Sequence, residues 1–138
     1  MPVEIPPQAW ARCWRRDYHT ADAVPGWPRL LVAQRHVVGS GYRVEGADPQ
    51  QGERTVLKLT LAGTGCLHDG RRLHRLGPGR GFLSALSGGQ ACFLDDEAGE
   101  PWEWVHVVLA GAEPLVMGLV ARHGPVFTLP PRPACLAR

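Results

Sequence analysis

Short apolar runs separated by turn residues dominate the middle of this chain, over residues 54–111. In the clearest run, residues 55–61, three leucines lie on one face and alternate with Val56, Lys58 and Thr60 on the other. A period of two is typical of a β-strand whose two faces meet different surroundings. The other runs are too short for a helix and end at Gly, Pro or Asp. They predict further strands at residues 66–68, 73–76, 82–86, 91–94 and 102–109.

The turns and flanking segments complete this strand pattern. Asp69-Gly70 is a strong hairpin signal between two of the predicted strands. Residues 29–44 predict one or two strands interrupted at Gly39-Ser40-Gly41, and residues 126–129 predict a last short strand. Residues 47–53 predict a loop.

Only one segment has helical spacing. Residues 113–122 place Leu115 and Leu119 one turn apart, while Pro114 suits the first turn and Gly124 a C-cap. Many short strands followed by one helix predict a mainly β fold. We expect an antiparallel double-sheet barrel, or jelly roll, with one C-terminal α-helix near residues 113–123.

The two ends of the chain lack a sustained period. Residues 1–27 are rich in Pro and aromatic side chains and predict an N-terminal arm, and residues 131–138 predict a proline-rich tail or linker. Because a buried Trp stabilises a fold by about 4–6 kcal/mol, we expect the arm to bury Trp10 and Trp14. The arm either packs on the core or closes over a ligand.

Composition excludes several classes of protein. The chain has 138 residues, of which 44% are hydrophobic, and this suits one domain that folds without a disulfide or metal. A net charge of +2 without a basic face argues against direct nucleic-acid binding. Four scattered cysteines without a C-x-x-C pair argue against a zinc or redox motif. The absence of a membrane span or signal peptide predicts a cytoplasmic protein with no membrane partner.

Three stretches carry a resemblance to a known family. The sequences LTLAGTGCLHDGRRLHRLGPGRGFL, EPWEWVHVVLAG and GPVFTL, in this order, resemble the cupin-type N-terminal effector-binding domain of AraC-family transcription regulators. The specific marks are the turn glycines, the corner at Pro78-Gly79 and the Pro-Trp-Glu-Trp strand. The resemblance assigns residues 28–130 to a cupin-like effector-binding domain that includes the predicted helix.

The resemblance implies a non-enzymatic sensor. Such a domain binds a small effector, a sugar or a small organic metabolite, inside its barrel and often forms a homodimer. The family reads DNA through a C-terminal helix-turn-helix domain, for which these residues leave no room, so we expect this chain not to bind DNA by itself. Two alternatives stay open: a small metal-dependent cupin enzyme, either an isomerase or a dioxygenase, and a barrel filled by its own side chains that only dimerises.

The residues argue against a cupin metal centre. By the resemblance, Gln90 stands where many cupins place a metal-binding His, and the other ligand positions fall near Gln50, Gly52 and Val56. None of these is a good ligand for a metal that needs three or four His, Cys or carboxylate groups. We therefore expect no metal and no cofactor.

Two further histidines leave a minor alternative. His68 and His74 flank the predicted hairpin turn, so they could lie across from each other near its tip and hold a metal there. Cross-strand histidines near a turn more often face solvent.

Candidate ligand-binding residues lie on three predicted strands. On residues 102–109, Trp104 and His106 share a face, and the resemblance assigns effector contact to these positions; the alternative is plain core packing. An aromatic ring beside an imidazole suits a sugar or planar metabolite. Gln90 and Cys92 share a second face, and nothing marks Cys92 as a nucleophile.

The strand over residues 55–61 allows two orientations. Its period alone turns the leucines toward the core and leaves Arg54 and Lys58 on a solvated face. The cupin-like register instead turns Arg54 and Lys58 toward the cavity and the leucines toward the helix. We adopt the second orientation, which predicts an anionic or polyhydroxy ligand.

Overall fold

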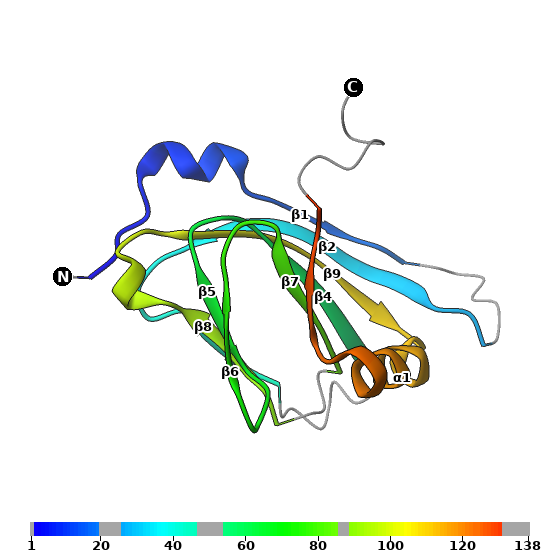
Figure 1. Ribbon diagram of the computed structural model, residues 1–138. Helices are drawn as coiled ribbons and strands as arrows, with labels where there is room; N and C mark the ends of the chain where they lie inside the picture. The colour runs from blue at the N-terminus through cyan, green and yellow to red at the C-terminus, as the bar shows by residue number, and fades with distance from the viewer. Residues whose placement is uncertain (1, 20–25, 47–53, 86–88, 131–138) are drawn as a thin grey trace.

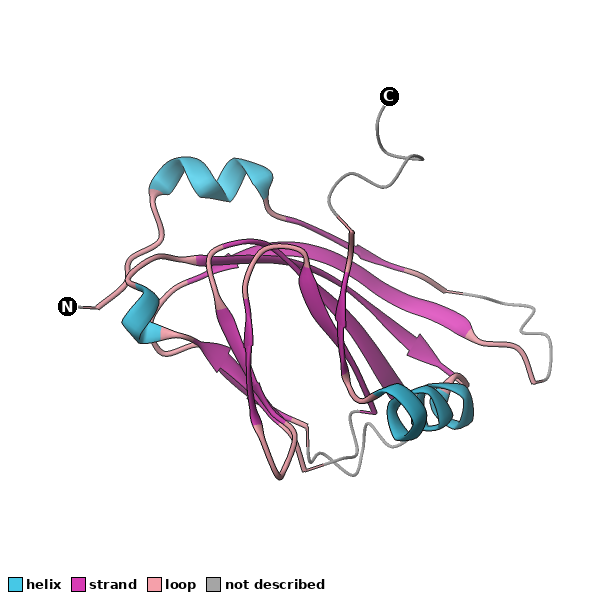
Figure 2. Ribbon diagram, viewed as in Figure 1, coloured by secondary structure: helices cyan, strands magenta, loops and turns pink. Residues whose placement is uncertain are grey.

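The alternating segments pair into two antiparallel sheets in the computed structural model, which describes residues 2–19, 26–46, 54–85 and 89–130 (Figures 1 and 2). The first sheet has the strand order β1-β2-β9-β4-β7-β10 and the second the order β3-β8-β5-β6. The predicted jelly-roll fold class is confirmed. The strands are β1 (Trp14–Asp17), β2 (Arg29–Val38), β3 (Arg43–Glu45), β4 (Arg54–Ala62), β5 (Gly65–His68), β6 (Leu73–Leu76), β7 (Arg80–Ala85), β8 (Ala91–Leu94), β9 (Trp102–Ala110) and β10 (Val126–Thr128).

Turn chemistry accounts for the predicted breaks. The Asp69 side chain accepts hydrogen bonds from the backbone N–H groups of Arg71 and Arg72 at 2.8 and 2.7 Å, and Gly70 has a φ of 96°. These contacts close the β5–β6 hairpin where the sequence predicts it. The expected interruption at residues 39–41 separates β2 from β3.

One α-helix follows the last long strand. Helix α1 (Glu113–His123) has a proline in its first turn, and the Gly124 N–H donates to the Val120 carbonyl at 2.8 Å. Within the described ranges, the 3-10 helices η1 (Pro7–Arg12) and η3 (Asp96–Ala98) were not predicted. Across the described ranges, no helix has the length and apolarity that a membrane crossing requires. The loop predicted at residues 47–53 and the tail at 131–138 lie outside the described residues.

The orientation of β4 decides what faces the interior. Lys58 is only 4% exposed and lines the space between the sheets together with Val56, whereas Leu61 is 37% exposed. Leu57 and Leu59 lie on the outer face, and α1 packs against β7 and β4. The orientation adopted from the resemblance is therefore right, and the one inferred from hydrophobic period alone is wrong.

The core cluster joins the two sheets. Trp102, which is fully buried, packs with Phe82, Leu67 and Leu76 in one cluster. The Trp102 Nε1–H donates to Thr60 Oγ1 at 2.9 Å, and the Thr60 hydroxyl donates to the Leu76 carbonyl at 3.1 Å. Because β4 and β6 belong to different sheets, this chain of hydrogen bonds fixes their relative position.

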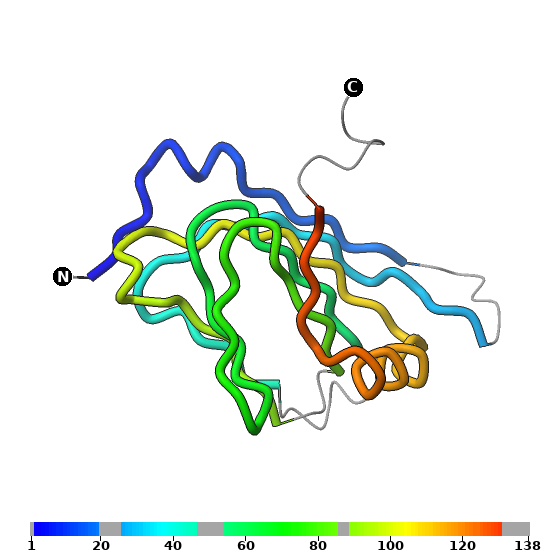
Figure 3. Tube along the Cα trace, in the orientation of Figure 1, coloured from blue at the N-terminus to red at the C-terminus, as the bar shows by residue number. Residues whose placement is uncertain are grey.

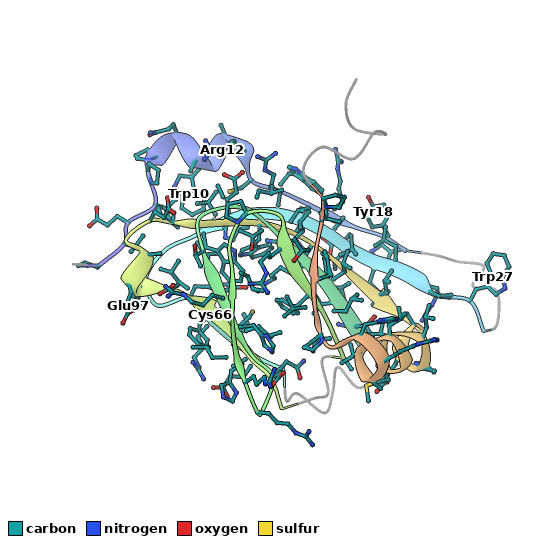
Figure 4. All side chains as sticks on the ribbon, viewed as in Figure 1. Trp10, Arg12, Tyr18, Trp27, Cys66 and Glu97 are labelled. Carbon is teal, nitrogen blue, oxygen red and sulfur yellow. The ribbon has the colours of Figure 1, made fainter. Side chains whose placement is uncertain are left out.

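The N-terminal segment is part of the first sheet. Strand β1 pairs with β2 along the sheet edge, as the chain trace in Figure 3 shows, and Val3 belongs to the core. Trp10 and Trp14 are 52% and 45% exposed, so the expectation that the arm buries both is wrong. Arg15 faces the cavity, and alternation therefore turns Trp14 outward. Trp27 is also exposed and extends away from the body of the molecule, far from Trp10 on η1 (Figure 4).

An ion-pair cluster ties this segment to the sheet. The buried Glu103 on β9 accepts hydrogen bonds from Arg12 at 2.9 Å and from Arg35 on β2 at 2.5 Å. Burial alone raises the pKa of Glu103, but the two arginines outweigh it and hold the pKa below its usual value. The carboxylate therefore stays charged and anchors η1 over β2 and β9.

Candidate functional site

A cavity of about 270 Å³ lies between the two sheets. Its lining comes from both sheets and from the turn after β2. This space shows that the barrel is not filled by its own side chains. Five of the six residues predicted to bind ligand line it, namely Arg54, Lys58, Gln90, Cys92 and His106.

Lys58 is the most unusual group in the cavity. Its Nζ donates to Tyr42 Oη at 2.7 Å and to Cys92 Sγ at 3.6 Å. The same Nζ lies 4.0 Å from the centroid of the Trp104 ring and 5.4 Å from that of Trp102. Burial lowers the pKa of Lys58, and Cys92 opposes this shift. Ring faces stabilise the ammonium form, and no Asp or Glu is among the described residues that line the cavity.

Trp104 and His106 lie side by side on β9. Their ring centroids are 4.6 Å apart in a stacked arrangement. Burial, with a further contribution from Lys58, lowers the pKa of His106 to about 3, so the imidazole is neutral at physiological pH. His106 lines the cavity, whereas Trp104 is buried behind it and contacts Lys58. Within the described part of the chain, Trp104 Nε1 and His106 Nδ1 are buried without a hydrogen-bond partner.

Gln90 is held by backbone contacts. Its side-chain Nε2 donates to the Ala85 carbonyl at 2.5 Å. The main-chain carbonyl of Gln90 accepts a hydrogen bond from the Gly46 N–H at 2.8 Å. A Cβ added at Gly46 would lie 2.5 Å from Gln90 Nε2. The glycine therefore makes room for this amide at the cavity wall.

Three polar lining residues were not identified from the sequence. Arg15 comes from β1, Gln34 from β2, and Tyr42 follows the turn at Gly41. Burial raises the pKa of Tyr42, so its hydroxyl stays protonated. Arg54, Lys58 and Arg15 give the cavity wall a basic character, although Arg15 is paired with the exposed Asp17 at 3.0 Å. One signal could have found its centre, because Lys58 is the single lysine among the fifteen Lys and Arg of the chain.

The residues present do not fit a cupin metal centre. The described residues hold no group of three or more His, Cys, Asp or Glu side chains that could bind a metal ion. The Gln90 amide is engaged by Ala85, and the Cys92 sulfur lies beside the Lys58 amine. A basic amine at this position repels a cation.

The hairpin histidines do not converge either. Strand register pairs His68 with Leu73 and His74 with Leu67, so the two imidazoles lie on opposite faces. His74 Nε2 is instead 2.9 Å from Asp69 Oδ2. The possibility of a metal held by both histidines is therefore wrong.

Comparison with known proteins bears on the fold. No protein-family model and no curated protein matches the sequence. The chain is similar to the solved structure of YhaK from Escherichia coli, with a TM-score of 0.58 and 13% identity, covering 73% of this chain and 45% of YhaK. The chain thus spans less than half the length of YhaK.

Two further structures match less closely. KdgF from Halomonas sp. aligns with a TM-score of 0.42 and 15% identity over 80% of this chain and 87% of KdgF. SPY1581 from Streptococcus pyogenes, described as a protein of unknown function, aligns with a TM-score of 0.38 and 10% identity over 70% of this chain and 93% of that protein. YhaK has a cupin fold, and the likeness to it shows that this chain is a cupin-like double-sheet barrel.

Proposed function

We propose that this domain binds a small anionic or polyhydroxy metabolite in its barrel and acts by binding rather than by turnover. The observation that carries the proposal is the buried Lys58 at the cavity. Arg15 and Arg54 line the same space, and its described lining includes no carboxylate. Arg15 already pairs with Asp17 at 3.0 Å, so a carboxylate or phosphate on the ligand supplies a counter-charge chiefly to Lys58 and Arg54.

The remaining lining gives the ligand its orientation. Val56, Phe82 and Val108 form apolar walls, while the Gln34 amide and the neutral His106 ring provide hydrogen-bonding groups. Such a mixture of apolar surface with a few polar groups is typical of a small-molecule site. The ligand that fits best is therefore small, with an anionic end and a polar or flat body.

We further propose that the domain is the effector-sensing part of an AraC-type transcription regulator in the cytoplasm. The support is the sequence resemblance together with the cupin-like fold. Ligand changes the geometry of a homodimer, because a signal requires different affinities for two states. DNA recognition belongs to a C-terminal helix-turn-helix domain. The exposed apolar side chains of Leu115 and Leu119, one turn apart on α1, are a candidate dimer surface.

Metal-dependent cupin enzymes are the competing class. Elemental analysis of purified protein separates the two. The described residues provide no cluster of ligands to hold such an ion, so we expect no bound metal. Stoichiometric iron, manganese, nickel or zinc would contradict the binding proposal and favour the enzyme.

Binding is tested by isothermal titration against carboxylates, sugar phosphates and neutral sugars. We expect an anionic ligand to bind and Lys58→Met to weaken it about tenfold or more, since a charge-assisted hydrogen bond contributes about 1.5–3 kcal/mol. The Met side chain keeps the volume and removes a buried charge, so Lys58→Met remains folded. Arg122→Gln, which alters an exposed residue of α1, is the matched control. Equal affinity in wild type and Lys58→Met contradicts the proposed site.

A further inference from the structure

The chain uses lysine at one position only. Arginine supplies every other basic side chain, including the two arginines of the cavity, Arg15 and Arg54. A guanidinium can hold an anion as well as an ammonium or better, but it does not lose its proton and act as a nucleophile. Anion binding explains a cation at position 58 but does not favour lysine over arginine there, whereas reaction with an electrophile requires an amine.

The surroundings of Lys58 suit such a reaction. The amine is 4% exposed yet lines the cavity, so a molecule bound there can reach an amine that is largely withdrawn from solvent. Burial lowers the pKa of the amine, which increases its nucleophilic fraction at neutral pH. The faces of Trp104 and Tyr42, at 4.0 and 5.2 Å from Nζ, stabilise a cationic nitrogen whether it is an ammonium or a protonated imine.

We propose that Lys58 reversibly captures a small oxo acid, a carboxylate that also carries an aldehyde or ketone, as an imine. This inference rests on the anion-binding function proposed above. The uncharged Nζ attacks the carbonyl carbon, the C=O π electrons move to oxygen, and a proton passes from nitrogen to that oxygen. The hydroxyl then leaves with the second nitrogen proton as water, and a C=N bond remains. No oxidant or reductant is consumed.

Two features place the partners for this step. Tyr42 Oη, 2.7 Å from Nζ, can accept the nitrogen proton while giving its own to the leaving hydroxyl, so the phenol ends unchanged. Its raised pKa keeps that proton in place at rest. Arg54 lines the same cavity and offers its guanidinium to the carboxylate of the oxo acid, whereas Arg15 is already paired with Asp17.

The test traps the imine with cyanoborohydride, using pyruvate and glyoxylate as probes. Lysine-specific proteolysis then cuts unmodified chain only after Lys58, whereas an adduct leaves it uncut. We expect the uncut fraction to rise with time for the two oxo acids and not for lactate, which has no carbonyl. Intact mass should show one reduced adduct, and modification of the N-terminal amine should be at least about tenfold slower.

Variants separate reaction from binding. Lys58→Arg keeps the charge and should bind the probes without any adduct. Tyr42→Phe should slow trapping about tenfold or more, because it removes the proton relay. Propionaldehyde, which lacks the carboxylate, should react more slowly than glyoxylate, and urea-unfolded protein should lose the preference for Lys58.

The possible failures are distinguishable. Saturable binding of the oxo acids without an adduct on Lys58 overturns covalent capture and leaves the anion-binding function standing. Equal modification of Lys58 and the N-terminal amine also overturns it, because the cavity then does nothing for the amine. Absence of both binding and adduct for the oxo acids and for the wider panel of anions overturns both proposals.

Discussion

His106 shows how one buried side chain makes stability depend on pH. In the folded protein, burial and the nearby Lys58 lower its pKa to about 3, while an unfolded chain titrates near the ordinary value of about 6.5. Between these values the unfolded state binds more protons than the folded state. The free energy of unfolding therefore falls as the pH falls from about 6.5 toward 3.

Replacing this imidazole should remove that pH dependence. We expect His106→Phe, which keeps a ring stacked on Trp104, to lose less stability between pH 8 and pH 5 than wild type. The difference should be about 1 kcal/mol after allowance for partial solvent screening. Urea unfolding at the two pH values measures it. His123→Asn, an exposed change on α1, should lose as much stability between the two pH values as wild type. An equal loss for His106→Phe and wild type would contradict the role of His106 in the pH dependence.

At the scale of elements, the contact between β5 and β9 holds the two sheets together. A Cβ added to Gly65 would lie 2.2–2.4 Å from the indole of Trp102. That ring is fully buried and hydrogen-bonded through its Nε1 to Thr60, so it has no free direction in which to move. The strand β5 approaches β9 this closely only because residue 65 has no side chain.

Adding one methyl group there should be costly. We expect Gly65→Ala to lower the free energy of unfolding by about 3 kcal/mol through overpacking. Chemical denaturation followed by circular dichroism gives the value. Gly118→Ala is the control, because a Cβ there meets no atom within 4 Å and alanine favours the helix. An unchanged midpoint for Gly65→Ala would show that the sheets can separate slightly at no cost.

At the scale of the whole molecule, α1 presents an apolar surface outward. Leu115 and Met117 are 63% and 54% exposed, and Leu119 is 40% exposed, while Val116 is buried against the barrel. Leu115 and Leu119 lie one turn apart on the same side of the helix, whereas Met117 lies on the other side, so this Leu pair is a candidate contact for a second copy of the chain.

The proposed homodimer makes a direct prediction. Sedimentation velocity at micromolar concentrations should show a dimer, and Leu115→Glu should convert it to a monomer with an unchanged circular dichroism spectrum. Arg43→Gln, on the exposed β3 strand of the other sheet, should remain dimeric. A monomeric wild type across this range of concentrations would remove the dimer from the proposal.

Apolar alternation and turn residues predicted most of the strands, and a strand without these signals was not predicted. Residues 55–61 alternate and end at glycines, and β4 lies there. Strand β1 was missed because all four of its residues, Trp-Arg-Arg-Asp, are exposed and show no apolar alternation. Its place depends on pairing with β2, and no local signal encodes that pairing.

The candidate site was predicted in part for a similar reason. Lys58 and His106 were found because strand parity and a resemblance place them on inward faces. Tyr42 was not found because it follows the glycine turn at Gly41. Arg15 was not found because it lies on β1, the strand that the local pattern did not predict.

Strand positions, hairpin turns and the helix thus follow from alternation and turn chemistry along the chain, which act between residues close in sequence. Which face of β4 turns inward, and which residues meet around Lys58, follow from the sheet order β2-β9-β4 and from the second sheet above it. Hydrophobic period favoured the opposite face, because leucines outside the barrel are also partly covered by α1. Only long-range packing decides between two half-apolar faces, and here it buried the single lysine of the chain in the cavity.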